Sequence, residues 1–382
     1  MHGKPERLRA GLITPTMLVL ALLSTIAIYF IGVRLQEGLG AVTNINAGYP
    51  WGIWVVFDIV IGTAFGCGGF AMALLIYVFN KGEYSPLMRP ALLGGLFGYT
   101  LAGVAVLVDL GRWWQFYNLA MPWYMQPNSV MLEIGLCVMA YVAVLWLEFS
   151  PAILERLGLE KMRKRIESAM WLLIALGIVL PTMHQSSLGT ALIPSGWRIS
   201  DLYQTPFLPL LFVSSAVAMG YGVVVVEATI VSHSFRRPSE HALLVRLGRV
   251  VGWLLVAWLV FRWADILWRD ATADAFAGNT VAISFWIENL LAVFAVIALL
   301  LPAWQASERM TFLGGVALLL FGSLYRLNAY LVAFKPVGNY TYFPSVPEIL
   351  VTVGIVALEV LLYLAFIKLF PVLAQPHRQA PV

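Results

Sequence analysis

Three titratable side chains stand inside long apolar runs of this sequence, where charged groups are rare. Asp58 lies in the run from Tyr49 to Phe79, Glu133 in the segment NSVMLE, and His184 in the segment LPTMHQSS. Carboxyl and imidazole groups exchange protons near neutral pH when burial and neighbouring charges tune them. These residues are therefore candidates for proton transfer to or from a substrate held in apolar surroundings.

The amino-acid composition indicates the class of protein in which these three residues lie. The chain has 382 residues, of which 60% are hydrophobic and 12% are charged, and no polar stretch is long enough to fold as a soluble domain. Its two cysteines, Cys67 and Cys137, lie in apolar runs and are too few for an iron-sulfur site or a disulfide framework. The excess of basic residues suits lipid-facing loops better than nucleic acid.

Apolar runs predict an all-α integral membrane fold with about ten transmembrane helices. About 20 residues are needed to cross the hydrocarbon layer, and we keep the first run as an uncleaved helix. We place the helices at 12–32, 51–79, 87–110, 128–149, 166–190, 206–231, 243–268, 279–303, 309–334 and 347–370.

A weak internal repeat suggests how these helices are grouped. The segment NSVMLE, which contains Glu133, resembles the segment NTV that precedes Glu288 four helices later. An offset of four helices preserves their orientation, so we expect two four-helix bundles, formed by helices 2–5 and 6–9 and flanked by one helix at each end. The corresponding divisions of the chain are 1–50, 51–192, 193–334 and 335–382.

Basic residues are distributed unevenly between the two sets of loops. Five lie on one side: Arg34, Arg112, Arg198, Arg269 and Lys335. The other side, with both termini, carries more: Lys4, Arg7, Arg9, Lys81, Arg89, Arg156, Lys161, Arg163, Lys164, Arg165, Arg236, Arg237, Arg309, Lys368 and Arg378. The positive-inside tendency predicts that both termini are cytoplasmic. Aromatic residues crowd the opposite, outer loops, either as an interfacial belt or as a docking surface for a partner.

This topology places the titratable residues at a common depth. Asp58 lies about 10 Å below the outer end of its helix, and Glu133 lies about one and a half turns down. His184 falls in the last two turns of its helix, where we expect Pro181 to cause a kink. Asp109 ends the third helix at the same level. Four helices thus converge on one layer, which favours a functional pocket that also includes Trp54 and Gln185.

Each residue also has an ordinary structural interpretation. Asp109 and Arg112 have the i, i+3 spacing of an interfacial ion pair. His184 is equally compatible with hydrogen-bonded structure, and Glu133 with helix packing. A second set of charged residues is expected to neutralise one another in the core of the second bundle: Arg262, Glu288 and Arg326.

The layer suits a quinone as substrate. A quinone needs an apolar slot, hydrogen-bond donors at its carbonyls, and acids that move protons as electrons arrive. A transmembrane b-type haem normally needs two histidines, and only His184 of the five falls in a predicted span; the others are His2, His233, His241 and His377. We therefore predict no haem and no iron-sulfur cluster in this chain, and an iron-sulfur partner on the outer loops.

Several segments resemble a known family. They are PWGIWVVFDIVIGTAFGCGGFA, YSPLMRPALLGGLFGY, VDLGRWW, NSVMLE, LPTMHQSSLG and NAYLVAFKP. Over nearly the whole chain they look like the NrfD/polysulfide-reductase-type quinone-interacting membrane subunits, most of all the HybB-type subunit of periplasmic nickel-iron hydrogenases. The resemblance implies functional roles for Asp58, Glu133 and His184, which match positions of the family's motifs. It implies that Glu133 is the acid that transfers protons. The expected quinone-binding set is Trp54, Asp58, Asp109, Arg112, Glu133, His184 and Gln185.

The resemblance also implies partners. These are a ferredoxin-like iron-sulfur subunit and the nickel-iron large and small subunits, on the periplasmic side of a bacterial inner membrane. The chain would form the quinone reductase or quinol oxidase site, with menaquinone or ubiquinone as substrate. One alternative is the membrane subunit of another periplasmic reductase, which would act on a sulfur compound or nitrite or be of the molybdopterin type. Two others are a proton-linked secondary transporter and a structural anchor.

Overall fold

The computed structural model describes residues 5–8, 11 and 13–373. The predicted all-α membrane fold is confirmed, since ten helices in the described part are long and apolar enough to cross a membrane. Extended backbone is paired there only in two isolated bridges, Glu6 with Leu373 and Ile199 with Phe334. Some residues used above lie outside the described residues: His2, Lys4, Arg9, His377 and Arg378.

The ten spans follow the predicted order. They are α1 (Pro15–Glu37); a second span made of η2 (Trp54–Ile61), α2 (Gly62–Phe65), α3 (Gly68–Ala73) and η3 (Leu74–Val78); η4 (Gly82–Leu87) with α4 (Met88–Asp109); α5 (Val130–Leu157); α7 (Met170–Thr190); α8 (Leu208–Ser234); α9 (His241–Trp268); α11 (Thr280–Leu300); α13 (Glu308–Leu327) with η8 (Asn328–Val332); and α14 (Val346–Leu369). Short helices connect them: η1 (Leu39–Ala41), η5 (Trp113–Ala120), η6 (Pro122–Tyr124), α6 (Glu160–Ser168), η7 (Ile193–Arg198), α10 (Thr272–Ala275) and α12 (Pro302–Gln305).

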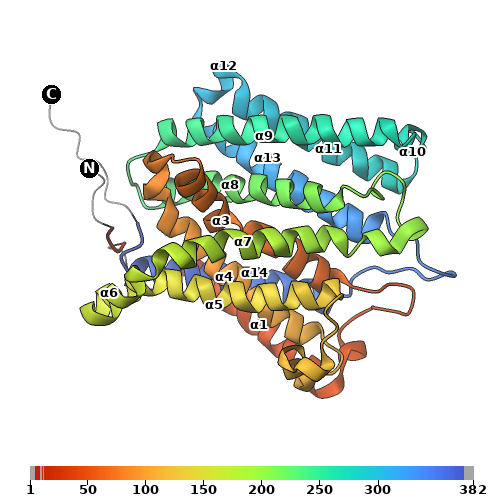
Figure 1. Cartoon of the computed structure of the whole chain (residues 1–382), viewed down its shortest axis with the longest axis horizontal. Helices are drawn as coiled ribbons and strands as arrows, with labels where there is room; N and C mark the ends of the chain where they lie inside the picture. The colour runs from red at the N-terminus through yellow and green to blue at the C-terminus, as the bar shows by residue number, and fades with distance from the viewer. Residues whose placement is uncertain (1–4, 9–10, 12, 374–382) are drawn as a thin grey trace.

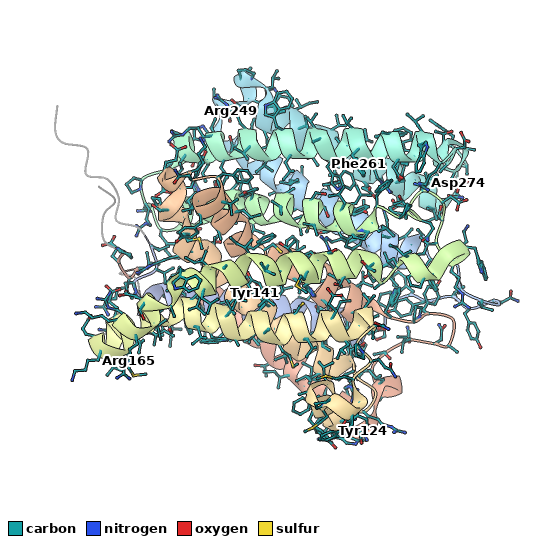
Figure 2. All side chains as sticks on the ribbon, viewed as in Figure 1. Tyr124, Tyr141, Arg165, Arg249, Phe261 and Asp274 are labelled. Atoms are coloured by element: carbon teal, nitrogen blue, oxygen red, sulfur yellow. The ribbon has the colours of Figure 1, made fainter. Side chains whose placement is uncertain are left out.

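The helices run side by side along one axis (Figure 1). Figure 2 shows Arg165 on α6 at one end of this axis and Asp274 on α10 at the other. The end that carries α6 is called the α6 end below, and the opposite end the α10 end. Ten long helices that lie side by side along one axis are the arrangement expected of a multi-pass membrane protein.

Contacts between helices form two closed circuits. In one, α3 packs on α4, α4 on α5, α5 on α7, and α7 on α3; in the other, α8 packs on α9, α9 on α11, α11 on α13, and α13 on α8. The circuits meet where α8 contacts α3 and α7. The first and last helices, α1 and α14, pack on each other and on α4. The proposed chain divisions at 51–192 and 193–334 stay a prediction.

The second span is the irregular one. It contains two π-helical segments, η2 and η3, and a break between α2 and α3. Glycines on neighbouring helices allow this backbone to approach closely, because a Cβ atom on Gly95 would lie 2.6 Å from the carbonyl oxygen of Gly66. The seventh α-helix, α7, runs without a break from Met170 to Thr190 and contains Pro181, where a kink stays a prediction.

Several helices are longer than predicted. Arg34, assigned to an outer loop from the sequence, lies in the last turn of α1 and is 1% exposed. His233 lies in the last turn of α8, and His241 is the first residue of α9. The hydropathy pattern underestimated these helices because their terminal turns contain polar residues, which can face the membrane interface.

A substitution at Gly220 should weaken the junction between the two circuits. A Cβ atom there would lie 2.6 Å from the carbonyl oxygen of Cys67, so Gly220→Ala forces α8 away from the second span. We expect a loss of about 1–3 kcal/mol, seen as a lower melting temperature of the purified protein in detergent. The control is Gly32→Ala in α1, where nothing lies within 4 Å of the added carbon. Equal melting temperatures for the two variants would contradict this packing.

Candidate functional site

Asp58 is the most unusual polar residue of the second span. It lies in the middle of the π-helical segment η2 and is 5% exposed. Neither of its carboxyl oxygens has a hydrogen-bond partner among the described residues. Extra residues in π-helical turns rotate the side chains that follow and are frequent at functional sites. Because buried polar groups are normally partnered, this carboxyl group is a strong candidate for contact with a ligand.

A chain of charged groups on three other helices begins beside Asp58. Asp109, at the end of α4, is half-buried and is its electrostatic neighbour. Arg34 of α1 and Glu348 of α14 are in turn electrostatic neighbours of Asp109. The guanidinium of Arg34 donates a hydrogen bond to the carbonyl oxygen of Leu110. The first and last helices of the chain therefore contribute charge to this site, which the sequence did not suggest.

Glu348 is held by many partners. Its carboxylate accepts hydrogen bonds from the backbone nitrogens of Asn44 at 2.9 Å and Ser345 at 2.8 Å, and from the Tyr342 hydroxyl at 2.7 Å. Burial, with the Glu348 carboxylate beside it, raises the pKa of Tyr342 above its usual value, so this hydroxyl stays a donor. Trp54 donates through Nε1 to the backbone carbonyl of Glu348 at 3.0 Å. Trp54 therefore packs the second span against α14.

His184 and Gln185 form a second polar group, deeper along the same span. Nε2 of His184 lies 3.1 Å from the Thr63 hydroxyl, and Nε2 of Gln185 donates to that hydroxyl at 3.0 Å and to the Tyr99 hydroxyl at 3.4 Å. All four side chains are completely buried. Nδ1 of His184 and Oε1 of Gln185 make no hydrogen bond of ordinary geometry with described residues. Thr63 follows Asp58 by five residues, which is about 7 Å along a helix.

Glu133 and Arg112 lie elsewhere. Glu133, in the first turn of α5, is exposed, as is Arg112 in the loop after α4. No ion pair joins Asp109 to Arg112 among the described residues, so the expected pair is not formed. Glu133 is thus available to lipid, solvent or a partner rather than enclosed with the other acids.

The predicted single layer is therefore divided. The structure brings Asp58 near Asp109, and His184 next to Gln185, but no hydrogen bond or ion pair in the described part joins Asp58, Glu133 and His184 to one another. The depths of these residues follow from helix length, whereas their directions depend on rotation about each helix axis. Nothing in the sequence pointed to Arg34, Thr63, Tyr99 or Glu348, except that each is polar within or beside an apolar run.

The second set of charged residues also differs from expectation. Arg262, Glu288 and Arg326 are all buried, yet no ion pair joins them in the described part of the chain. Arg326 instead donates to the carbonyl oxygens of Val60 at 3.0 Å and Phe212 at 2.8 Å. Arg326 therefore points at the second span rather than at Glu288, whereas Arg262 is an electrostatic neighbour of Glu288, and neutralisation of that pair stays a prediction.

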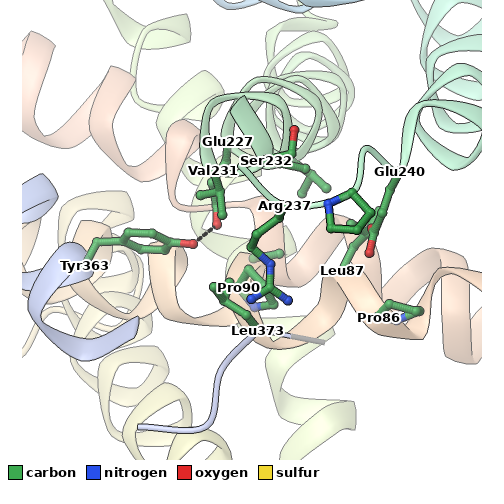
Figure 3. A pocket seen from close by; sticks show the side chains of 14 residues that line it. Pro86, Leu87, Pro90, Glu227, Val231, Ser232, Arg237, Glu240, Tyr363 and Leu373 are labelled. Atoms are coloured by element: carbon green, nitrogen blue, oxygen red, sulfur yellow. Dashed lines mark hydrogen bonds between the residues drawn. The ribbon is translucent and has the colours of Figure 1, made fainter. Parts of the chain in front are cut away.

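A cavity lies near the α6 end of the molecule, away from the predicted residues. Its lining includes Glu227 of α8, Tyr363 of α14 and Arg237 of the loop after α8. Figure 3 shows the Tyr363 hydroxyl donating to Glu227 at the inner wall. None of the residues predicted to bind the quinone lines this cavity.

A comparison with protein families identifies the class. The model for "Polysulphide reductase, NrfD" matches residues 41–332, which include Asp58, Asp109 and the His184 group but neither Arg34 nor Glu348. The chain belongs to this NrfD family of integral membrane subunits. The resemblance seen in the sequence is thereby confirmed.

Individual relatives make the relationship more specific. The chain is 40% identical to the "Probable Ni/Fe-hydrogenase 2 b-type cytochrome subunit" of Escherichia coli (strain K12), over 98% of this chain and 96% of the relative. It is 28% identical to the "Menaquinone reductase, integral membrane subunit" of Nitratidesulfovibrio vulgaris, over 58% of this chain and 55% of the relative. A selenate reductase subunit of Mesobacillus selenatarsenatis is 28% identical over 44% of this chain and 38% of that protein.

The name of the Escherichia coli relative contradicts our prediction that this chain carries no haem, because it describes a b-type cytochrome subunit. His233 and His241, which we expected outside the spans, also lie within helices α8 and α9. In the described part, however, His184 is the one histidine that is fully buried, and its Nε2 atom is engaged by Thr63. A b-type haem is normally held by two imidazoles, and the interior of the described part offers the imidazole of His184.

The Thr63 hydroxyl should be important for the stability of the His184 group. Replacing it in Thr63→Val leaves the His184 and Gln185 nitrogens without their shared partner in a fully buried site. We expect a loss of about 1–3 kcal/mol, measured as a lower melting temperature. Thr25→Val in α1 is the matched control, since its hydroxyl is exposed and bonds a carbonyl of its own helix. A melting temperature for Thr63→Val as high as that of the control would show that this network is not needed.

Proposed function

We propose that this chain passes electrons between a periplasmic nickel-iron hydrogenase, through an iron-sulfur subunit, and the quinone pool, with coupled proton transfer. The similarity to a hydrogenase 2 subunit over nearly the whole chain supports the partner. The similarity to a menaquinone reductase subunit supports the substrate. The observation that carries the proposal is the buried Asp58 carboxyl group, both of whose oxygens lack a partner in the described part.

The quinone would lie against η2, near the end of α4. Reduction of a quinone to a quinol takes two electrons, from the iron-sulfur partner, and two protons. Asp58 would bond one carbonyl oxygen or the hydroxyl formed from it, and the Nδ1 atom of His184 would serve the deeper side of the ring. Gln185 would hold His184 through their shared hydroxyl, Thr63. Trp54 and Asp109 would form the walls of this site.

Proton exchange is assigned to Glu133. Its exposed position in the first turn of α5 lets it reach water or headgroups while the ring stays in apolar surroundings. Arg112, exposed beyond the end of α4, would attract the acidic or phosphate groups that lie near this entrance. The same site run in reverse would oxidise quinol.

The proposed orientation puts both termini in the cytoplasm of a bacterial inner membrane. The basic helix α6 then lies on the cytoplasmic side, and α10 with the aromatic loops on the periplasmic side. Exposed aromatic residues of η5 and η6 include Trp114, Trp123 and Tyr124. They lie at the level where a periplasmic iron-sulfur subunit would meet the membrane surface.

A second candidate keeps the same quinone chemistry but changes the catalytic partner. The menaquinone reductase and selenate reductase relatives favour it, although each aligns with only part of the chain. Copurification from the native membrane decides between the two. Nickel-iron subunits would support the hydrogenase, and a molybdopterin or other reductase subunit would support the alternative.

Replacement of Glu133 tests the proton role. In Glu133→Gln the side chain keeps its size but can no longer exchange a proton, so hydrogen-dependent reduction of quinone should be lost while the complex still assembles. Hydrogen oxidation with an artificial dye, which bypasses the quinone, should be unchanged. Glu37→Gln, an exposed acid at the end of α1, is the matched control. Normal quinone reduction in Glu133→Gln would reject the assignment.

Replacement of Asp58 tests the binding site. Asp58→Asn should lower the rate of hydrogen-dependent quinone reduction by about tenfold or more, because an amide cannot donate or accept the required proton. The control is Asp270→Asn in an exposed loop residue with φ of 54°, a conformation that Asn tolerates. If both variants reduce quinone equally well, the ring does not depend on Asp58.

A further inference from the structure

A second group of buried polar residues lies in the circuit formed by α8, α9, α11 and α13. Arg262 of α9 and Glu288 of α11 are 0% and 1% exposed. Tyr203, in the segment before α8, and Tyr325 of α13 are also completely buried. None of these residues has a role in the function proposed above, so the inference that follows is independent of it.

The guanidinium of Arg262 is enclosed by aromatic rings. Its central carbon lies 4.8 Å from the ring centre of Tyr203 and 5.4 Å from that of Tyr325. Cation–π contacts of this kind compensate its charge in part. They leave its N–H groups without acceptors, since Nε, Nη1 and Nη2 find no hydrogen-bond partner among the described residues.

Unused hydrogen-bonding atoms stand close to this guanidinium. Glu288 accepts at Oε2 from the Tyr203 hydroxyl at 2.6 Å and from Nδ2 of Asn328 at 2.9 Å. Its other oxygen, Oε1, has no partner in the described part, and neither has the Tyr325 hydroxyl. Arg262 is an electrostatic neighbour of both Glu288 and Tyr325. Donors and acceptors that all lack partners are therefore gathered in one enclosed place.

Tyr203 stays protonated within this group. Burial, with the Glu288 carboxylate beside it, raises the pKa of Tyr203 well above its usual value. Its hydroxyl donates to Glu288 and accepts from Nδ2 of Asn328 at 2.9 Å, so it is already engaged on both sides. The unmet groups that remain are the N–H donors of Arg262, Oε1 of Glu288 and the Tyr325 hydroxyl.

The chemistry of these atoms selects the ligand. Buried polar groups almost always find a protein or water partner. The charges of Arg262 and Glu288 cancel, so the site does not call for an ion. A water molecule is small and neutral, and it accepts from Arg262 while donating to Glu288. We propose that one or more water molecules bind between Arg262, Glu288 and Tyr325, forming a hydrated site inside the second circuit.

This site gives the second circuit a role distinct from that of the first. Bound water would connect Glu288 to Tyr325 through hydrogen bonds, so that a proton can be held there away from lipid. In the first circuit, by contrast, Glu133 is exposed and Asp58 is free to meet a larger substrate.

Radiolytic hydroxyl-radical labelling of the purified protein, read by mass spectrometry, tests the proposal. Radicals formed from bound water oxidise the side chains next to it, whereas dry buried side chains are protected. Tyr203 and Tyr325 should be oxidised at least about fivefold faster than Tyr330. Tyr330 is the matched residue, because it is 2% exposed and its hydroxyl donates to the Leu188 carbonyl at 2.6 Å. Equal oxidation of the three tyrosines would overturn the proposal.

Two variants sharpen the result. The double substitution Arg262→Met with Glu288→Met removes the polar groups and should lower oxidation of Tyr325 to the level of Tyr330. Glu288→Gln keeps hydrogen-bonding atoms and should retain the labelling. Unchanged labelling in the double variant would show that radicals reach Tyr325 by another route and would also overturn the proposal. If the double variant fails to assemble, the comparison within the unsubstituted protein still decides.

Discussion

Polar groups buried in this protein have to be partnered by the chain itself, because the hydrocarbon layer offers no hydrogen bonds. Arg326 shows how strongly this constraint organises the fold. From α13 it donates to the carbonyl of Val60 in the second span and to the carbonyl of Phe212 in α8. Trp51 likewise donates to the carbonyl of Tyr330 at 2.8 Å. The bond to Phe212 lies within the second circuit, whereas the bonds between Arg326 and Val60 and between Trp51 and Tyr330 connect that circuit to the second span.

Asp58 is informative because it departs from this rule. Its neighbour Asp109 comes from α4, and Asp109 in turn lies near Arg34 of α1 and Glu348 of α14. Glu348 is engaged by backbone and tyrosine donors. The surroundings of Asp58 are therefore fixed while its own oxygens are not used. A carboxyl group held in this way is available to bind a ligand. The helices at the two ends of the chain, α1 and α14, contribute charged residues to the site.

The number of spans could be predicted because it depends on the length of each apolar run. About 20 residues are needed to cross the membrane, so ten helices followed from counting residues, while the common depth of Asp58, Glu133 and His184 stays a prediction. Rotation about each helix was not predictable in the same way. The π-helical turns of η2 change the direction of Asp58, and Glu133 proves to be exposed. Neither feature has a marker in hydropathy.

Long-range partners were also beyond the sequence. Glu348 is separated from Asn44, whose backbone it binds, by 304 residues along the chain. Arg34 looked like a loop residue because a basic group ends the apolar run, yet the helix continues to Glu37. The same error in helix ends placed His233 and His241 outside the spans and made the prediction of no haem appear firmer than it was.

The most direct measurement is a structure of the complete complex with a quinone analogue bound. The account predicts that a ring oxygen of the analogue lies within hydrogen-bond distance of the Asp58 carboxyl group, against η2 and the end of α4. An analogue bound at another place, with the Asp58 oxygens occupied by protein groups or still unpartnered, would contradict it.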